Sequence, residues 1–189
     1  MSFFNFRLGI FMLVIGIAVF ILQSHRETRA DGIYHVDRVV DGDTIVVSQI
    51  GENLRKDEEK IRLIGLNTPE TVDPRKAVQC FGQEASTKAK AILEDATIRL
   101  ASDPSQDAHD KYGRLLAYVF VQKATSSESS DGGELLFNQY MIEQGYGYEY
   151  TYNIPYLYQK QFKKAEKVAR AEGKGLWAKG VCEGQRLKK

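Results

Sequence analysis

Two alternating runs of β-branched residues, 34–40 and 44–50, are separated only by Asp41-Gly42-Asp43. An Asp-Gly pair supplies the positive φ that a tight turn needs, so this pattern predicts a β-hairpin. A third apolar run, residues 61–66, follows a polar connection, and Pro69 ends it because proline has no backbone N–H to donate. The folded part of the chain is therefore expected to open with three consecutive strands.

The rest of the sequence predicts two more strands and three helices. A helix is expected over 84–93, a strand over 97–101, a strand over 114–121, a mobile serine-rich loop over 123–133 and a helix over 134–144. A third helix is expected from about Pro155, with an apolar stripe of Tyr158, Phe162, Ala165 and Ala169, and Gly173 and Gly175 after it. Five strands with flanking helices predict a mostly β, α+β fold, namely a five-stranded barrel.

The first thirty residues form a region of their own. Arg7 precedes fifteen uninterrupted apolar residues, 8–22, and a polar segment follows up to residue 30. Fifteen helical residues extend roughly 22 Å, less than the roughly 30 Å of a bilayer's hydrocarbon core, so both a cleaved export signal and a membrane anchor remain open. In either case we expect the folded domain, residues 31–180, to lie outside the cytoplasm, followed by a basic tail over 181–189.

Bulk charge does not indicate nucleic-acid binding, since without residues 1–30 the chain holds 23 basic and 24 acidic residues. The distribution is uneven, because residues 155–189 contain ten basic side chains and three acidic ones. Such a region either attracts a phosphate backbone or forms an ordinary solvated helix face. Both interpretations remain open on the sequence alone.

The two cysteines, Cys80 and Cys182, permit a disulfide in an exported chain. A bond between them would close a loop of about 100 residues and stabilise the fold by roughly 4–5 kcal/mol in the chain-entropy model. Two separate thiols are the alternative. The spacing excludes a CxxC motif and the three histidines are scattered, so zinc is not expected.

Four charged residues are candidates for metal binding, phosphate binding or proton transfer. Asp43 follows the hairpin turn, where its carboxylate could bind a hard cation or simply belong to the turn. Arg62 lies within an apolar strand and needs an anionic partner, either a structural ion pair or a phosphate. Glu70 is a candidate general base toward a water molecule, or a solvated loop residue. Arg114, at the start of a strand, is expected to reach the barrel rim.

Four motifs, in this order along the chain, carry a resemblance to one family. They are Asp41-Gly42-Asp43-Thr44, Arg62 through Thr68-Pro69-Glu70, Phe81-Gly82-Gln83-Glu84-Ala85-Ser86, and Asp110-Lys111-Tyr112-Gly113-Arg114. With the closing Gly175-Leu176-Trp177, they make residues 34–177 resemble the staphylococcal nuclease (thermonuclease) family. The resemblance implies an OB-fold and calcium-dependent endonucleolytic cleavage of DNA and RNA, leaving 5′-hydroxyl and 3′-phosphate ends.

The resemblance also implies roles for the matching residues. Three would bind the metal: Asp43 directly, Asn67 at the second ligand position, and Thr68 through its backbone carbonyl. Three would act on the phosphodiester: Arg62 and Arg114 by binding the phosphate, and Glu70 by positioning or deprotonating the attacking water. Residues at substrate-contact positions are Lys76, Lys111, Tyr112 and one of Tyr150 and Tyr152, the last as a base-stacking tyrosine. Arginines and a divalent ion would stabilise the charge that develops on the phosphorus.

Position 67 departs from the best-known members of the family, because an asparagine amide stands where they have a carboxylate. Calcium affinity follows ligand charge, so weaker calcium binding is expected and other divalent ions come into consideration. The alternative function is a catalytically silent OB-fold module that binds nucleic acid. We favour an enzyme, because such a module has no reason to combine Arg62, Glu70 and Arg114 with Asp43. A Ser-His-Asp hydrolase is excluded by the lack of a Gly-x-Ser-x-Gly motif, and a monomer is expected.

Overall fold

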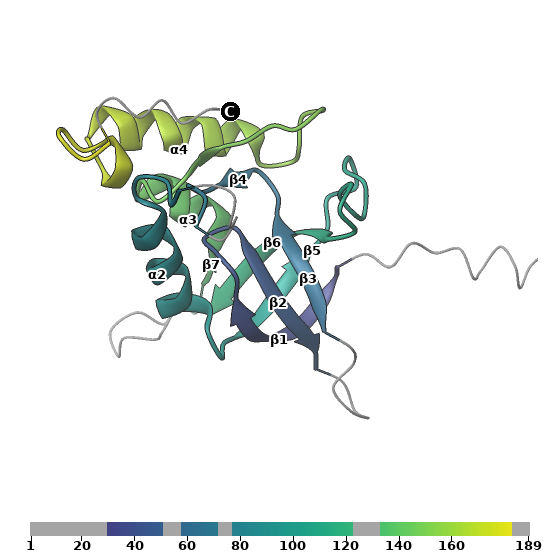
Figure 1. Cartoon of the computed structure of the whole chain (residues 1–189). Coiled ribbons are helices and arrows are strands. Elements are labelled where there is room, and N and C mark those ends of the chain that lie inside the picture. Colours follow the sequence, from purple (N-terminus) through teal and green to yellow (C-terminus); the bar gives the residue numbers. More distant parts are fainter. Residues whose placement is uncertain (1–29, 51–57, 72–76, 123–132, 183–189) are drawn as a thin grey trace, which may run out of the picture.

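Five strands form a closed barrel in the computed structural model, which describes residues 30–50, 58–71, 77–122 and 133–182. Antiparallel pairing gives the order β3-β2-β1-β5-β6, and a parallel pairing of β6 with β3 closes the barrel (Figure 1). The strands are β1 (Gly32–Val39), β2 (Thr44–Gln49), β3 (Glu59–Leu63), β5 (Thr97–Ala101) and β6 (Leu115–Gln122). The predicted five-stranded OB-fold barrel is therefore confirmed.

The predicted hairpin joins β1 to β2, and its turn packs against the loop that follows β3. Inward-facing residues of the barrel strands, such as Val36, Ile45 and Leu100, are almost completely buried. Gly42 is required in the turn for space, because a Cβ there would lie 2.7 Å from the side chain of Thr68. This close approach brings Asp43 next to the residues that come directly after the third strand.

Three helices cover the barrel, as predicted, with different bounds from those expected. In Figure 1, α2 (Gly82–Leu93) lies beside the barrel and α4 (Gln159–Ala171) lies across one end of it. The third helix, α3 (Phe137–Glu143), packs against both β6 and α4. Buried alanines and a leucine attach α2 to the barrel, and the expected stripe of α4 is buried at Phe162, Ala165 and Ala169.

The prediction of a helix over 134–144 was wrong for its first turn. Residues Glu134–Leu136 form a short strand, β7, which extends the sheet by pairing with β6, and α3 begins only at Phe137. The helix expected from Pro155 begins four residues later. Its preceding backbone is engaged elsewhere, because the Pro155 carbonyl accepts hydrogen bonds from Ser105 and Gln106.

The third strand is also shorter than expected, ending at Leu63 instead of Leu66. Gly65 has a positive φ of 73° and turns the chain, so that β4 (Leu66–Asn67) pairs with β8 (Tyr148–Glu149) in a separate two-stranded sheet. Ile64 and Leu66 therefore lie beyond the strand that contains Arg62. The turn instead carries Asn67 across to a strand that the sequence did not predict.

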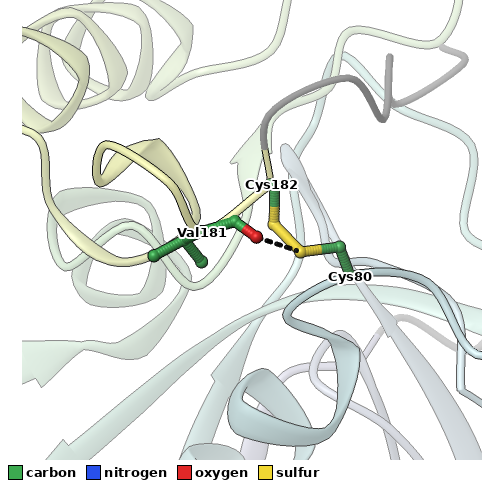
Figure 2. Close-up of a disulfide and its surroundings, with 3 residues drawn as sticks. All are labelled: Cys80, Val181 and Cys182. Atoms are coloured by element: carbon green, nitrogen blue, oxygen red, sulfur yellow. Dashed lines mark hydrogen bonds between the residues drawn. A yellow bond between two sulfur atoms is a disulfide. The ribbon is translucent and has the colours of Figure 1, made fainter.

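The C-terminal part of the domain is attached at two places. The short 3₁₀ helix η1 (Gly175–Trp177) meets the end of α3, where the Leu176 N–H donates to the Gly145 carbonyl at 2.9 Å. Cys182 is joined to Cys80 in a disulfide, and the Val181 carbonyl oxygen contacts the Cys80 sulfur at 3.2 Å (Figure 2). Of the two alternatives for the cysteines, the bonded pair is the one observed.

Three predicted segments fall wholly or largely on residues that the structure does not describe. Residues 1–29, with the expected signal or anchor, the greater part of the loop over 123–133, and residues 183–189 of the expected tail all lie outside the described residues. Within the described part, none of the helices has the length and apolar character needed to span a membrane. The expected division of the chain into segments at residues 30 and 180 stays a prediction.

A buried carboxylate fastens the segment before α4 to the barrel. Asp103 is 2% exposed and accepts hydrogen bonds from the Tyr118 hydroxyl at 2.6 Å, the Leu157 N–H at 2.7 Å and both the N–H and hydroxyl of Ser105. Burial alone would raise the pKa of Asp103, but these hydrogen bonds hold it below its ordinary value. The carboxylate is thus stabilised in its ionised form in the folded protein.

Replacing Asp103 with asparagine is expected to lower the free energy of unfolding at pH 7 by about 2–3 kcal/mol, because charged acceptors make the stronger hydrogen bonds. The folded-state pKa is depressed, so the contribution is present above the unfolded value of about 3.9 and is lost as pH falls through the folded value. Urea titrations from pH 7 to pH 2 should show a difference that is constant above about pH 4 and narrows below it. The exposed Asp107, changed to asparagine, is the control, and a constant difference across this range would contradict the assignment.

Candidate active site

Asp43 lies at the centre of the hydrogen-bond network. Its side chain is almost buried, and one carboxylate oxygen, Oδ1, accepts a hydrogen bond from the Thr44 hydroxyl at 3.0 Å. The other oxygen, Oδ2, accepts from the Thr68 N–H at 2.8 Å and pairs with Arg62 Nη2 at 3.1 Å. One carboxylate therefore joins the hairpin turn, the third strand and the loop after that strand.

Arg62 reaches across the turn between β3 and β4. Its Nη1 donates to the backbone carbonyls of Leu63 at 3.0 Å and Leu66 at 2.6 Å, and its Nη2 donates to Asn67 Oδ1 at 2.9 Å. The side chain is only 13% exposed. The sequence predicts an anionic partner for Arg62, and in the structure this partner is Asp43. The structural ion pair is therefore observed, whereas a contact of Arg62 with phosphate stays a prediction.

Arg114 lies on the other side of Asp43. Its Nη1 donates to the Thr44 hydroxyl at 3.3 Å, and that hydroxyl in turn donates to Asp43 Oδ1. Its Nε and Nη2 contact Asp110 Oδ2 at 2.7 and 2.6 Å, while Asp110 Oδ1 accepts the backbone N–H groups of Tyr112 and Arg114. Asp110 therefore both builds the turn and aims the arginine. Burial would raise the pKa of Asp110, but the hydrogen bonds from Arg114 and Tyr112 hold it low.

The turn that holds Asp43 contains a second carboxylate, Asp41, and together they suit a cation. Burial and the neighbouring Asp43 raise the pKa of Asp41 to about 7, so the turn disfavours two uncompensated negative charges. Among the described residues there is no group of three or more His, Cys, Asp or Glu side chains that could hold a metal ion. The predicted ligand set does not depend on such a group, since Asn67 would offer an amide oxygen and Thr68 a backbone carbonyl. An all-oxygen set of this kind fits a hard cation.

Glu70 lies two residues after Thr68, on a loop held from both sides by Gln79. The Glu70 N–H donates to the Gln79 side-chain carbonyl at 2.9 Å, and the Gln79 N–H donates to the Glu70 carbonyl at 2.9 Å. The Glu70 carboxylate accepts the N–H of Thr71 at 2.9 Å. Gly82 allows α2 to begin against this loop, because a Cβ there would lie 2.7 Å from Thr71 Cγ2.

Most of the predicted substrate contacts lie together at an exposed surface. Lys111 Nζ is 5.1 Å and Arg114 Cζ is 5.5 Å from the ring centre of Tyr112, whose side chain is 72% exposed. Tyr112 and Tyr152 raise the pKa of Lys111, and the rings of Tyr150 and Tyr152 are 6.3 Å apart. Arg114 thus connects this aromatic surface to Asp43. Lys76 lies outside the described residues.

Three contributors to the site were missed from the sequence. Thr44 links Arg114 to Asp43, Gln79 holds the Glu70 loop, and Tyr148 accepts a hydrogen bond from Asn67 Nδ2 at 2.6 Å. Tyrosines alternate from 146 to 152 with the period of a strand, and this signal could have revealed β8 and Tyr148. Thr44 belongs to the first motif, but its link to Arg114 spans 70 residues and cannot be seen locally, and no motif includes Gln79.

Comparisons with known proteins agree with the motifs. Residues 60–179 match the family model described as "Staphylococcal nuclease homologue". The chain is 33% identical over 179 residues to the thermonuclease of Staphylococcus intermedius, covering 89% of this chain and 95% of that protein. It is 36% identical over 145 residues to the thermonuclease of Staphylococcus hyicus, covering 77% and 75%. It is also 36% identical over 144 residues to the SPbeta prophage-derived endonuclease YokF of Bacillus subtilis, covering 76% and 43%. The chain therefore belongs to the staphylococcal nuclease family and is a nuclease.

Proposed function

We propose that this nuclease is a calcium-dependent endonuclease that hydrolyses DNA and RNA with little sequence specificity, leaving 5′-hydroxyl and 3′-phosphate ends. The observation that carries the proposal is the network in which Arg62 and Arg114 approach Asp43 from its two carboxylate oxygens. Two arginines beside a metal-ligand carboxylate suit a phosphodiester, whose charge grows as the phosphorus is attacked. The family relationship supports the same reaction class.

The cation would be held by the carboxylate of Asp43, the Oδ1 atom of Asn67 and the backbone carbonyl of Thr68. When bound, it supplies positive charge beside the phosphate oxygens. Arg114 and Arg62 would donate hydrogen bonds to the phosphate, which requires Arg62 to exchange protein oxygens for substrate oxygens. Glu70 would accept the proton of the attacking water, from a loop whose position Gln79 fixes.

Low sequence specificity follows from the kind of contacts that the surface offers. Arginine and lysine bind phosphates, which are the same at every nucleotide. The exposed Tyr112 and Tyr152 offer ring faces on which any base can stack. Neither kind of contact reads base edges, so DNA and RNA are both suitable substrates.

The place of action that we propose is outside the cytoplasm, either after export or on a membrane anchor, with the protein acting as a monomer. The Cys80–Cys182 disulfide supports this location, because disulfides persist in oxidising compartments. The apolar run over residues 8–22 is the part of the sequence that would direct export or anchoring.

The test is incubation of the purified full-length chain with supercoiled plasmid, single-stranded DNA and RNA, in calcium or in chelator. Nicked and linear plasmid, cleavage of all three substrates and loss of activity in chelator are expected. End-labelling that requires prior phosphatase treatment at the 3′ end would identify the products. Full activity in chelator would contradict the metal requirement, and binding without cleavage would favour the silent OB-fold module.

Changing Asn67 to aspartate is expected to lower the half-saturating calcium concentration on the order of tenfold, because a carboxylate adds one ligand charge. Calcium titrations of plasmid hydrolysis would measure the change. The exposed Asn153, changed to aspartate, controls for bulk charge. An unchanged or higher half-saturating concentration in Asn67→Asp would contradict the expectation that calcium affinity at this site follows ligand charge.

A further inference from the structure

The amide of Asn67 needs an orientation that a carboxylate at the same position would not need. A carboxylate presents two equivalent acceptor oxygens, whereas an amide has one acceptor, Oδ1, and one donor group, Nδ2. Only Oδ1 can bind a cation. In the structure Oδ1 accepts a hydrogen bond from Arg62 Nη2, the same atom that pairs with Asp43, whereas Nδ2 points to the opposite side.

The group on that opposite side is Tyr148. Its hydroxyl oxygen accepts a hydrogen bond from Asn67 Nδ2 at 2.6 Å, and its side chain is almost completely buried. An acceptor at Nδ2 satisfies a donor group at this partly buried position. Through the conjugated amide it also draws electron density toward Oδ1, as hydrogen bonds in a chain strengthen one another.

The position of Tyr148 is fixed by the backbone. Tyr148 lies directly opposite Asn67 in the pairing of β4 with β8, where cross-strand side chains are close neighbours. Gly147 brings the two strands together, because a Cβ there would lie 2.8 Å from the Asn67 carbonyl oxygen. On the other side of β8, the Glu149 N–H donates to Glu166 of α4 at 2.8 Å. The hydroxyl is thus held at Asn67 by the fold itself.

We propose that Tyr148 is a positioning residue for the metal site: it accepts the Asn67 Nδ2 hydrogen bond and thereby holds Oδ1 toward Asp43 as a neutral cation ligand. This inference rests on the proposed calcium-dependent function. It also explains how an asparagine at position 67 would serve as a ligand. With aspartate at that position, the Tyr148 hydroxyl would donate to the carboxylate and compete with the cation. The effect of Tyr148 on calcium affinity would then change from favourable to unfavourable.

The test is a double-mutant cycle of Tyr148→Phe and Asn67→Asp, with calcium binding measured by calorimetry on the full-length chain without substrate. Tyr148→Phe is expected to raise the calcium Kd about fivefold or more with asparagine at position 67. In the Asn67→Asp background it is expected to leave the Kd unchanged or to lower it. Tyr140→Phe, a half-buried tyrosine on α3, is the control.

Equal weakening in both backgrounds, or no effect with asparagine at position 67, would overturn the role of Tyr148 alone. Absence of calcium binding by the wild type would overturn the calcium assignment and this inference with it. A measurement on the metal-free wild type covers the case in which Tyr148→Phe does not fold. The side-chain NH₂ protons of Asn67 should exchange with water more slowly than those of the exposed Asn153, and equal exchange would count against the hydrogen bond.

Discussion

Changing Glu70 to glutamine is expected to lower kcat for plasmid cleavage by a factor of about 10²–10⁴, the usual contribution of a general base. Glutamine has the same shape and keeps an oxygen that can accept the Thr71 N–H, so the loop conformation is expected to persist. The backbone contacts with Gln79 do not involve the Glu70 side chain and remain available. The substitution therefore removes the ability to accept a proton with little change in structure.

Steady-state kinetics on plasmid and single-stranded DNA, with calcium saturating, would measure this loss. Substrate binding and the thermal unfolding temperature should stay close to those of the wild type, because the change is confined to the proton acceptor. Glu172→Gln, at an exposed glutamate beyond the end of α4, is the matched control and should retain wild-type kcat. A Glu70→Gln enzyme with nearly full activity would remove Glu70 from the mechanism.

The barrel could be predicted from the sequence because its strands alternate clearly and its turns contain Gly, Pro and Asp. The strand expected over 97–101 coincides with β5, and the hairpin was placed to within two residues at each end. The failures occur where tertiary contacts override local preference. Glu134, Leu135 and Leu136 are good helix formers, yet they form β7 because β6 offers them an edge to pair with.

The two-stranded sheet of β4 and β8 could not be predicted for a different reason. Each strand has two residues, too few for a periodic pattern, and the pairing joins positions about 80 residues apart. The same limit applies to the site. Motifs identified Asp43, Arg62 and Arg114, whereas the bridging role of Thr44 depends on a hydrogen bond to Arg114 across 70 residues. Local sequence gives the chemistry of each group, and the closed barrel decides which groups meet.

Removing the disulfide is expected to have the largest effect on stability. The bond joins positions 102 residues apart, so the chain-entropy model gives about 4–5 kcal/mol, equivalent to a fall in Tm of about 10–20 °C for a domain of this size. Scanning calorimetry of the oxidised wild type, the reduced wild type and the Cys80→Ser, Cys182→Ser double variant would measure it. Reductant should not change the Tm of the double variant, which is the internal control.

The same substitution should also affect the loop that carries Glu70, because Cys80 follows Gln79, whose side chain and backbone both bind Glu70. With the disulfide present, this loop is tied to the C-terminal segment at Cys182 (Figure 2). Without it, the loop depends on the Gln79 contacts and on the packing of Gly82 against Thr71. We therefore expect kcat to decrease at temperatures well below the lowered Tm. A double variant whose Tm lies within about 3 °C of the wild type would show that the cross-link constrains little of the unfolded chain.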